Sequence, residues 1–414
     1  MSADGPWHAD CRLFTGFSPC RHRRSCGGCP HYDPVQTRVL LIQLDALGDV
    51  LRTTALLPGI RRRWPAAHVT WLTRPAAAPL LRNNPLVDRV LTLGEATPAV
   101  VSALRFDVAL CADKSIVAGA LMRSVRADEK KGFGVDDNGV IQPLTPAADR
   151  LFALGLDNQA KFFDNQESEQ ALMAAALEIP YQHDRYVVVL DDEERGWARA
   201  DRAAARMDDG SLLVGWNTGC GPRYPYKRLD PDDQVRVMRL THERLRRPDR
   251  ARFFLLGGGP EDAARNAAIA EALAEHGVEA IEGPCGGGLR RGLASVAACD
   301  VVVSGDTLGL HMAIGLKKPV IAWFGITCHQ EIDVYGRGIK VLADVPCRPC
   351  WMQSCSQEPK CFRQLPWQGL ADGVVEVVDS LVRRGRFEGE RLVGAFPPER
   401  WLPAPAGVLP GPIL

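Results

Sequence analysis

The sequence lacks an excess of charge of either sign, because 50 Lys and Arg residues balance 50 Asp and Glu residues. A chain without net charge has no overall field that favours nucleic acid or an anionic membrane. It also lacks any apolar run near the roughly 18 residues that a membrane-spanning helix requires. The first residues, MSADGPWHADCRLF, lack the basic start and apolar core of a secretory signal. We therefore expect a cytoplasmic protein that binds no nucleic acid and makes at most peripheral contact with the inner face of the cytoplasmic membrane.

The chain is long, and it is rich in apolar residues and in cysteine. The 414 residues exceed one compact domain and fit two of ordinary size. A composition of 46% hydrophobic and 24% charged residues is typical of a soluble globular protein. Thirteen cysteines are many for a reducing compartment, where cysteines serve more often as metal ligands or core residues than in disulfides.

From Arg38 onward, apolar β-rich runs alternate with helical segments, and the alternation restarts after a polar linker expected at 191–210. Nearly continuous apolar strands separated by helices indicate a buried parallel sheet with helices on both faces. We therefore predict an α/β protein with two Rossmann-like doubly wound domains that face each other across a cleft. The expected segments are a cysteine-rich extension (1–37), the two domains (38–205 and 206–370) and a C-terminal helix with a Pro-rich tail (371–414).

The individual elements follow from the apolar periodicity and from the turn residues between the periodic runs. In the first domain we expect strands at 39–44, 68–73, 89–93 and 106–113, and helices up to about 63, at 77–81 and at 167–180. In the second domain we expect strands at 211–219, 251–259, 278–283, 300–306 and 319–325, and helices at 231–246, 260–276, 289–298 and 307–316. A fold of this kind binds its ligand at the carboxyl ends of the strands.

The stretch VLLIQLDALGDVLRTT (39–54) places two carboxylates, Asp45 and Asp49, around Gly48 at the mouth of a predicted strand. Asp49 lies where the strand ends and the helix starts. It is either a helix cap that accepts a first-turn N–H group or a general base that faces the cleft. Glycine permits close approach of a ligand or an unusual backbone angle. The residues alone leave both alternatives open.

A second loop, GWNTGCGPRYPYKRLDPDD (215–233), follows another predicted strand. The strand delivers Asn217 and Thr218 into a glycine-bearing loop, and Lys227 comes just before a helix. Small residues and cations in such a loop suit a phosphate group, whereas the alternative is an ordinary loop with solvated cations.

A third loop lies in VVVSGDTLGLHMAIG (301–315), where a strand ends at Asp306 and Thr307 and a helix starts at once. The N–H groups and the positive dipole end of a helix N-terminus form an anion site that suits a diphosphate. His311 lies one turn into this helix and is either a core residue or part of the site. Glu261, after the GGGP at 257–260, could meet a ribose hydroxyl.

Eight of the thirteen cysteines form two tight quartets. The N-terminal quartet is Cys11, Cys20, Cys26 and Cys29, and the C-terminal quartet is Cys347, Cys350, Cys355 and Cys361. Four thiolates from one loop suit tetrahedral zinc or iron. The alternative is unligated thiols in irregular loops. We expect zinc ahead of iron.

With the three loops in this order, the chain resembles glycosyltransferase family 9, the ADP-heptose:lipopolysaccharide heptosyltransferases, over roughly 38–365. The segments that carry the resemblance are LDALGDVLRTTALLPGIRRRWP, GWNTGCGPRYPYKRL and SGDTLGLHMAIGLKKPVIAWFG. The resemblance implies a GT-B fold and an inverting enzyme whose chemistry needs no metal or other cofactor. It therefore also implies a structural role for an ion in either cysteine quartet. In the autotransporter-directed members, a loop similar to 347–361 holds iron.

The resemblance also implies roles for individual residues. Asp49 and Lys227 are the expected catalytic residues: Asp49 takes the proton of the acceptor hydroxyl, and Lys227 stabilises the leaving diphosphate. Asp45 is expected to shape the loop. The expected donor-binding residues are Asn217, Thr218, Gly219, Lys227, Glu261, Asp306, Thr307, Gly309, Leu310 and His311.

The expected function is therefore transfer of a heptose or related sugar from a nucleotide-diphosphate donor, ADP-heptose foremost, to an envelope glycan or lipid-linked acceptor such as lipopolysaccharide. One alternative keeps the fold and moves the sugar to a protein side chain, as autotransporter heptosyltransferases do. Another is a non-catalytic module that binds a sugar nucleotide.

Overall fold

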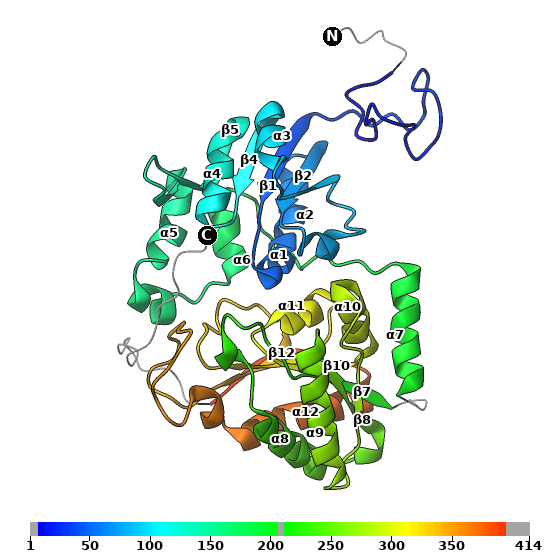
Figure 1. The fold of residues 1–414 in the computed structure, drawn as a ribbon, viewed down its shortest axis with the longest axis vertical. Helices are drawn as coiled ribbons and strands as arrows, with labels where there is room; N and C mark the ends of the chain where they lie inside the picture. Colours follow the sequence, from blue (N-terminus) through cyan, green and yellow to red (C-terminus); the bar gives the residue numbers. More distant parts are fainter. Residues whose placement is uncertain (1–6, 206–210, 395–414) are drawn as a thin grey trace. The chain divides into compact units, whose positions relative to one another are not determined.

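A computed structural model describes residues 7–205 and 211–394, which Figure 1 draws as a coloured ribbon. The chain divides into two compact units. Unit 1 contains the described residues up to Phe152 together with Ala171–Asp184, and unit 2 contains Ala153–Gln170 and the described residues from Arg185 onward. The end of the expected linker (206–210) and the expected Pro-rich tail from 395 lie outside the described residues.

Unit 1 is built on a six-stranded sheet in the order β3-β2-β1-β4-β5-β6. Its pairs are parallel except β5 with β6. Val39–Ile42 in the central strand are completely buried, as a strand covered on both faces requires. The strands are β1 (Thr37–Ile42), β2 (Ala67–Thr73), β3 (Arg89–Thr92), β4 (Arg105–Cys111), β5 (Arg126–Val135) and β6 (Ile141–Pro143).

The helical segment after β1, predicted as one helix to about Arg63, is divided. It consists of α1 (Leu47–Thr53), a 3₁₀ turn (Thr54–Leu56) and α2 (Leu57–Arg63). Pro58 lies in the first turn of α2, where its missing N–H removes no internal helix bond. The other helices up to residue 176 are α3 (Thr97–Ala103), α4 (Ile116–Ser124), α5 (Asp149–Leu154) and α6 (Glu169–Ala176), with short 3₁₀ or π segments at Ala78–Leu81, Pro146–Ala148 and Ala160–Asp164.

Unit 2 contains a seven-stranded sheet in the order β13-β12-β11-β10-β7-β8-β9. All of its strand pairs are parallel. The strands are β7 (Leu212–Asn217), β8 (Ala251–Leu256), β9 (Ala280–Glu282), β10 (Val301–Gly305), β11 (Val320–Phe324), β12 (Arg337–Leu342) and β13 (Gly389–Val393).

Helices cover both faces of this second sheet. Apolar residues of α8 (Pro231–Arg244), α9 (Pro260–Ala274) and α12 (Trp367–Arg384) share one core with the strands. Two other helices, α10 (Gly288–Ala298) and α11 (Leu308–Gly315), contact each other and the strands outside that core. The predicted fold of two Rossmann-like doubly wound units is confirmed. Within the described residues, no helix is both long enough and apolar enough to cross a membrane.

The expected polar linker was wrong over most of its length, because α7 (Asp192–Ala204) occupies it. Asp191 caps this helix by accepting the N–H of Glu194 at 3.0 Å, and Glu194 accepts the N–H of Asp191 in return. Glu194 is buried against Arg290 of α10. The polar residues of the segment are therefore partners of arginines rather than signs of a linker. The predicted boundary at 205 also differs from the change between the compact units at Asp184.

Ahead of β1, the described residues 7–36 contain no helix and no strand. An isolated bridge joins Cys11 to Pro34. Figure 1 shows this segment as a dark blue irregular coil.

Candidate functional site

Each sheet has one point at which the strand order reverses, and doubly wound sheets bind ligands at that point, outside the carboxyl ends of the strands. In unit 1 the reversal lies between β1 and β4, and in unit 2 it lies between β7 and β10. Residues predicted from the sequence lie there. Asp49 follows β1, Asn217 ends β7, and Asp306 follows β10.

Asp49 is in the first turn of α1, and Ala46 is the residue at the N-cap position. One carboxylate oxygen of Asp49 accepts the N–H of Ala46 at 3.2 Å, and the other accepts a hydrogen bond from Arg52 at 2.6 Å. The side chain is 41% exposed. Asp49 therefore supports the start of the helix while its carboxylate stays accessible to solvent.

Asp45 and Asp113 shape the loop around Asp49. Asp45 forms an ion pair with Arg74. The buried Asp113, just beyond β4, accepts the N–H groups of Leu44 and Asp45 at 2.9 and 3.2 Å and that of Ser115 at 2.8 Å. Asp113 thus joins the two strand ends at the reversal point. Sequence reasoning missed it, although its place at the end of the run FDVALCAD was a signal.

Lys227 and Asp306 form a buried ion pair at the reversal point of unit 2. The Lys227 ammonium lies 3.0 Å from the Asp306 carboxylate, and the side chains are 17% and 7% exposed. Burial alone would raise the pKa of Asp306, but Lys227 and then His311 outweigh it and hold that pKa at about 2. Gly305 permits this approach, because a Cβ there would lie 2.0 Å from the Lys227 carbonyl oxygen.

Asn217 connects the two loops that carry this pair. Its side-chain amide donates to the Gly219 carbonyl at 3.1 Å and lies 2.9 Å from the Thr307 hydroxyl and 3.0 Å from that of Ser304. Gly309, in the first turn of α11, leaves room for it, since a Cβ there would lie 2.8 Å from the Asn217 side chain. Thr307 occupies the N-cap position of α11. These residues hold the N-terminus of α11 beside the loop after β7.

Thr218 is completely buried, and its hydroxyl bonds to Asn266 at 2.6 Å. Thr218 was predicted to bind the donor, and its buried hydroxyl instead connects the loop after β7 to α9. Glu261 is exposed in the first turn of α9. The next residue, Asp262, was not predicted: it accepts the N–H of Gly258 at 2.9 Å, and a Cβ on Gly219 would lie 2.4 Å from its carboxylate.

His311 is buried on α11. Its Nε2 lies 3.8 Å from Asp306, and its Nδ1 is 3.2 Å from the hydroxyl of Tyr186. Its neighbour Leu310 is completely buried in the same helix. His311 therefore supports Asp306 from the interior, and Leu310 packs in the core.

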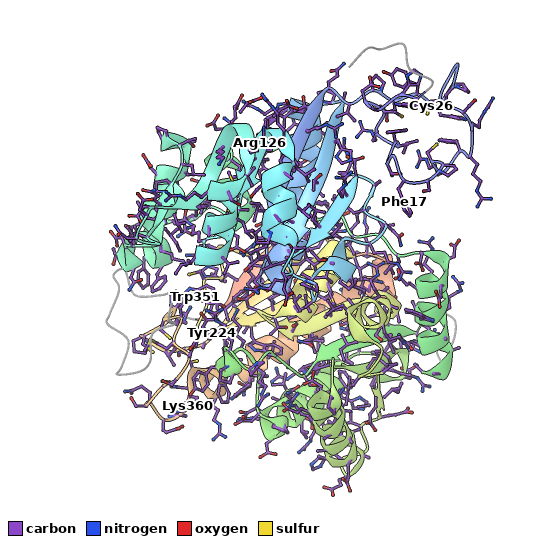
Figure 2. All side chains as sticks on the ribbon, turned by 45° about the horizontal axis from the view of Figure 1, so that its top comes forward. Phe17, Cys26, Arg126, Tyr224, Trp351 and Lys360 are labelled. Atoms are coloured by element: carbon purple, nitrogen blue, oxygen red, sulfur yellow. The ribbon has the colours of Figure 1, made fainter. Side chains whose placement is uncertain are left out.

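Two aromatic residues that were not predicted flank Lys227. The ammonium lies 5.5 Å from the ring centre of Tyr224 and 5.3 Å from that of Trp351. The rings pack edge to face with centres 5.8 Å apart, and Figure 2 labels both residues. The backbone N–H of Trp351 donates to Ile326 at 2.8 Å, and its indole N–H donates to Cys328 at 3.4 Å. Trp351 is thus a fixed wall beside the Lys227 ammonium.

The C-terminal quartet lies in the same loop as Trp351. Cys347, Cys350, Cys355 and Cys361 line one cavity of about 30 Å³. Burial raises the pKa of Cys361 to about 12, and the other three thiols add to the rise. All thirteen cysteines are free thiols. Within the described ranges, no three His, Cys, Asp or Glu side chains have an arrangement that could hold a metal ion as they stand.

Known proteins resemble this chain in sequence and in fold. Residues 251–361, from β8 to the last cysteine of the C-terminal quartet, match glycosyltransferase family 9 (heptosyltransferase). Over 343 residues the chain is 25% identical to lipopolysaccharide heptosyltransferase 1 of Pseudomonas aeruginosa, with 78% of this chain and 88% of that protein covered.

Solved structures show the same fold. The family 9 glycosyltransferase of Veillonella parvula gives a TM-score of 0.59 at 16% identity, over 74% of this chain and 86% of that one. The Escherichia coli heptosyltransferase WaaC, solved with ADP, gives a TM-score of 0.53 at 16% identity, over 84% and 98% of the two chains.

Each unit has a doubly wound sheet with a charged loop at its reversal point, and the chain shares this fold with the GT-B heptosyltransferases. Residues 251–361 match the glycosyltransferase family 9 model, and this match agrees with the family resemblance seen in the sequence.

Proposed function

We propose that this enzyme transfers a heptose or closely related sugar, with inversion, from an ADP-linked donor to a hydroxyl of an envelope glycan or lipid-linked acceptor such as lipopolysaccharide. The Lys227–Asp306 pair beside the N-terminus of α11 carries the proposal. It combines a cation with a helix dipole at the reversal point of unit 2, which is the combination that a diphosphate requires. The names of the relatives, lipopolysaccharide heptosyltransferase 1 and a heptosyltransferase with ADP, support the donor and the acceptor class.

In this proposal Asp49 is the general base. Its carboxylate is held by Ala46 and Arg52 yet remains 41% exposed, so an acceptor hydroxyl can displace solvent from it. Asp49 takes the proton as the acceptor oxygen bonds to the anomeric carbon. A positioned base typically contributes about 10²- to 10⁴-fold in rate.

Residues of unit 2 stabilise the leaving group in this proposal. As the bond between the anomeric carbon and the phosphate oxygen breaks, its electron pair leaves with the diphosphate. Lys227 and the first-turn N–H groups of α11 stabilise that charge. Asp306 and His311 keep Lys227 in place from the buried side. The reaction needs no metal or other cofactor in this scheme.

The donor is tested first by thermal shift with ADP, GDP, UDP and ADP-heptose. We expect selective stabilisation by the ADP compounds, by about 2.7 kcal/mol at a concentration of 100 times Kd. Turnover with an isolated lipopolysaccharide core and with a protein acceptor then distinguishes glycan from side-chain transfer. Donor binding without transfer to any acceptor would instead support a non-catalytic module. Selective stabilisation by GDP or UDP would refute the ADP assignment.

We also propose that the C-terminal quartet binds one structural metal ion, zinc ahead of iron. The four cysteines line a single cavity of about 30 Å³, which has room for one ion or water. The ion would order the loop that carries Trp351 and would take no part in sugar transfer. Elemental analysis of protein purified without chelator tests this: Cys347→Ser with Cys350→Ser should remove about one equivalent per chain. Unchanged metal content would refute it.

We also propose that the enzyme acts in the cytoplasm. A lipid-linked acceptor would bring the enzyme to the inner face of the cytoplasmic membrane by peripheral contact. Sedimentation with vesicles that contain the acceptor lipid, compared with vesicles that lack it, measures such contact.

A further inference from the structure

The cysteine-rich segment of residues 7–36 has no interior of its own. None of its residues is buried, and it contains no helix or strand. A segment of this size that cannot bury a core is usually held by cross-links or by a metal ion. Since its cysteines are all free thiols, disulfides do not supply the cross-links.

Turns nevertheless bring its cysteines together. The N–H of Cys29 donates to the carbonyl of Cys26 at 3.0 Å, which closes the C-x2-C turn, and the N–H of Arg23 donates to the carbonyl of Cys20 at 2.8 Å. Cys11, Cys20, Cys26 and Cys29 line one cavity of about 90 Å³. Figure 2 labels Cys26 within this loop, at the upper right of the view.

Within unit 1, the segment is also fixed to the sheet. Arg12, next to Cys11, pairs with Asp33 at 2.7 Å and with Asp88 at 3.1 Å. Asp88 in turn pairs with Arg61 of α2 at 2.8 Å. These contacts lie at the amino ends of β2 and β3, whereas Asp49 follows the carboxyl end of β1. The cavity therefore lies near the amino ends of the strands, whereas the proposed base follows the carboxyl end of β1.

We propose that Cys11, Cys20, Cys26 and Cys29 bind one zinc ion that folds this segment and fixes it to the sheet of unit 1. Binding releases four protons to solvent, because each thiol becomes a thiolate as its sulfur bonds to the metal. A four-thiolate zinc centre carries two negative charges, and Arg21, Arg23 and Arg24, between two of the ligands, offset them. Among the described residues no three such side chains stand in an arrangement that holds an ion, so zinc binding requires the thiols to rotate into the cavity that they line. This site is independent of the proposed function.

Metal content tests the proposal on the full chain, purified from zinc-supplemented cells without chelator. Replacing Cys26→Ser together with Cys29→Ser should remove about one equivalent of zinc per chain. The pair Cys347→Ser and Cys350→Ser should leave that equivalent in place, whatever the C-terminal quartet binds. The control Cys285→Ser changes a half-buried thiol outside both quartets and should leave the content unchanged. A loss of less than about half an equivalent in the Cys26, Cys29 variant would overturn the site.

The ligand set has its own control in the same loop. His31 lines the cavity too, and its ring stacks on His22 with centres 3.8 Å apart. With four cysteine ligands, His31→Ala keeps the zinc and Cys11→Ser loses it. The reverse result would overturn the four-thiolate set, and one equivalent of iron in place of zinc would overturn the assignment to zinc.

Alkylation of the unaltered chain gives a readout that does not depend on how the variants fold. Peptide mapping should find the four thiols protected from iodoacetamide, and a chelator should expose all four together. Equal alkylation rates with and without chelator would overturn the proposal.

Discussion

Asp49 lies in unit 1 and Asp306 lies in unit 2, and the surroundings of these two carboxylates differ. Each carboxylate comes after a parallel strand at the reversal point of its sheet. Asp49 is 41% exposed and paired with Arg52, whereas Asp306 is 7% exposed and paired with Lys227. An exposed ion pair contributes about 0–1 kcal/mol, but removing one partner of a buried pair costs about 3–5 kcal/mol.

The difference in burial separates two chemical roles. An accessible carboxylate can exchange its partner for a substrate hydroxyl, which a general base must do. Asp306 cannot, since its pKa of about 2 and its burial keep it ionised and bound to Lys227. The difference supports the proposed roles, in which an exposed carboxylate of unit 1 takes a proton and a buried charge of unit 2 orients a cation.

The largest effect is expected for Asp49→Asn. The amide keeps the size of the side chain but cannot take a proton, so turnover should fall about 10²- to 10⁴-fold. Binding of ADP should be nearly unchanged, because the proposed phosphate contacts all lie in unit 2. Steady-state kinetics and titration calorimetry measure the two effects.

Asp45→Asn is the matched control for that variant. Asp45 is a carboxylate of the same loop, but it pairs with Arg74, so its loss should affect turnover far less. Near-normal turnover of Asp49→Asn with lowered stability would instead limit Asp49 to its contact with the Ala46 N–H.

Lys227→Ala should have the next largest effect, which is a loss of affinity for the nucleotide diphosphate. A charged hydrogen bond to phosphate is worth about 1.5–3 kcal/mol, so the affinity for ADP should fall about 10- to 100-fold. Adenosine should bind almost as before, since it has no phosphate. The control Lys317→Ala removes an exposed cation beyond the other end of α11. Equal weakening for ADP and adenosine, seen by calorimetry, would contradict a phosphate contact.

The buried pair also predicts a dependence of stability on pH. The folded-state pKa of Asp306 lies near 2, below the usual 3.8, so its ionised form stabilises the folded state. This contribution, about 2 kcal/mol at about 1.4 kcal/mol per pKa unit, is complete above about pH 4. It is lost as the pH falls through about 2. Urea unfolding should therefore show that the gap between wild type and Asp306→Asn narrows below pH 4, and a gap that stays constant would contradict the ion pair.

The fold and the charged loops could be predicted from the sequence because their signals are local. Apolar runs such as VLLIQL and VVVSG locate strands, and a polar loop directly after a strand locates the binding edge. Lys227, Asp306 and Asn217 all follow from such patterns. The helix α7 was missed although Asp191 and Glu194 give a local signal for a helix start. The burial of Glu194 has no local signal, because its partner Arg290 lies 96 positions away.

The missed residues of the site have the same explanation. Asp113 acts on the loop after β1, 69 positions before it, and Trp351 contacts Lys227 from the cysteine-rich loop. No local pattern links these pairs. These contacts can be recognised only in the folded structure, where segments far apart in the sequence lie together.

The smallest expected effect concerns Trp351, which sharpens the picture of unit 2 as a fixed cation site. Its ring lies 5.3 Å from the Lys227 ammonium, and a cation–π contact contributes about 0.5–2 kcal/mol. Trp351→Ala should therefore weaken ADP binding about 2- to 30-fold, because Lys227 loses one of the side chains that limit its motion. Trp351→Phe keeps an aromatic face and should recover most of the affinity. In a double-mutant cycle with Lys227→Ala, measured by calorimetry, the two losses should not add, because Trp351 acts through the ammonium. Additive losses would mean that Trp351 contacts the nucleotide independently of Lys227.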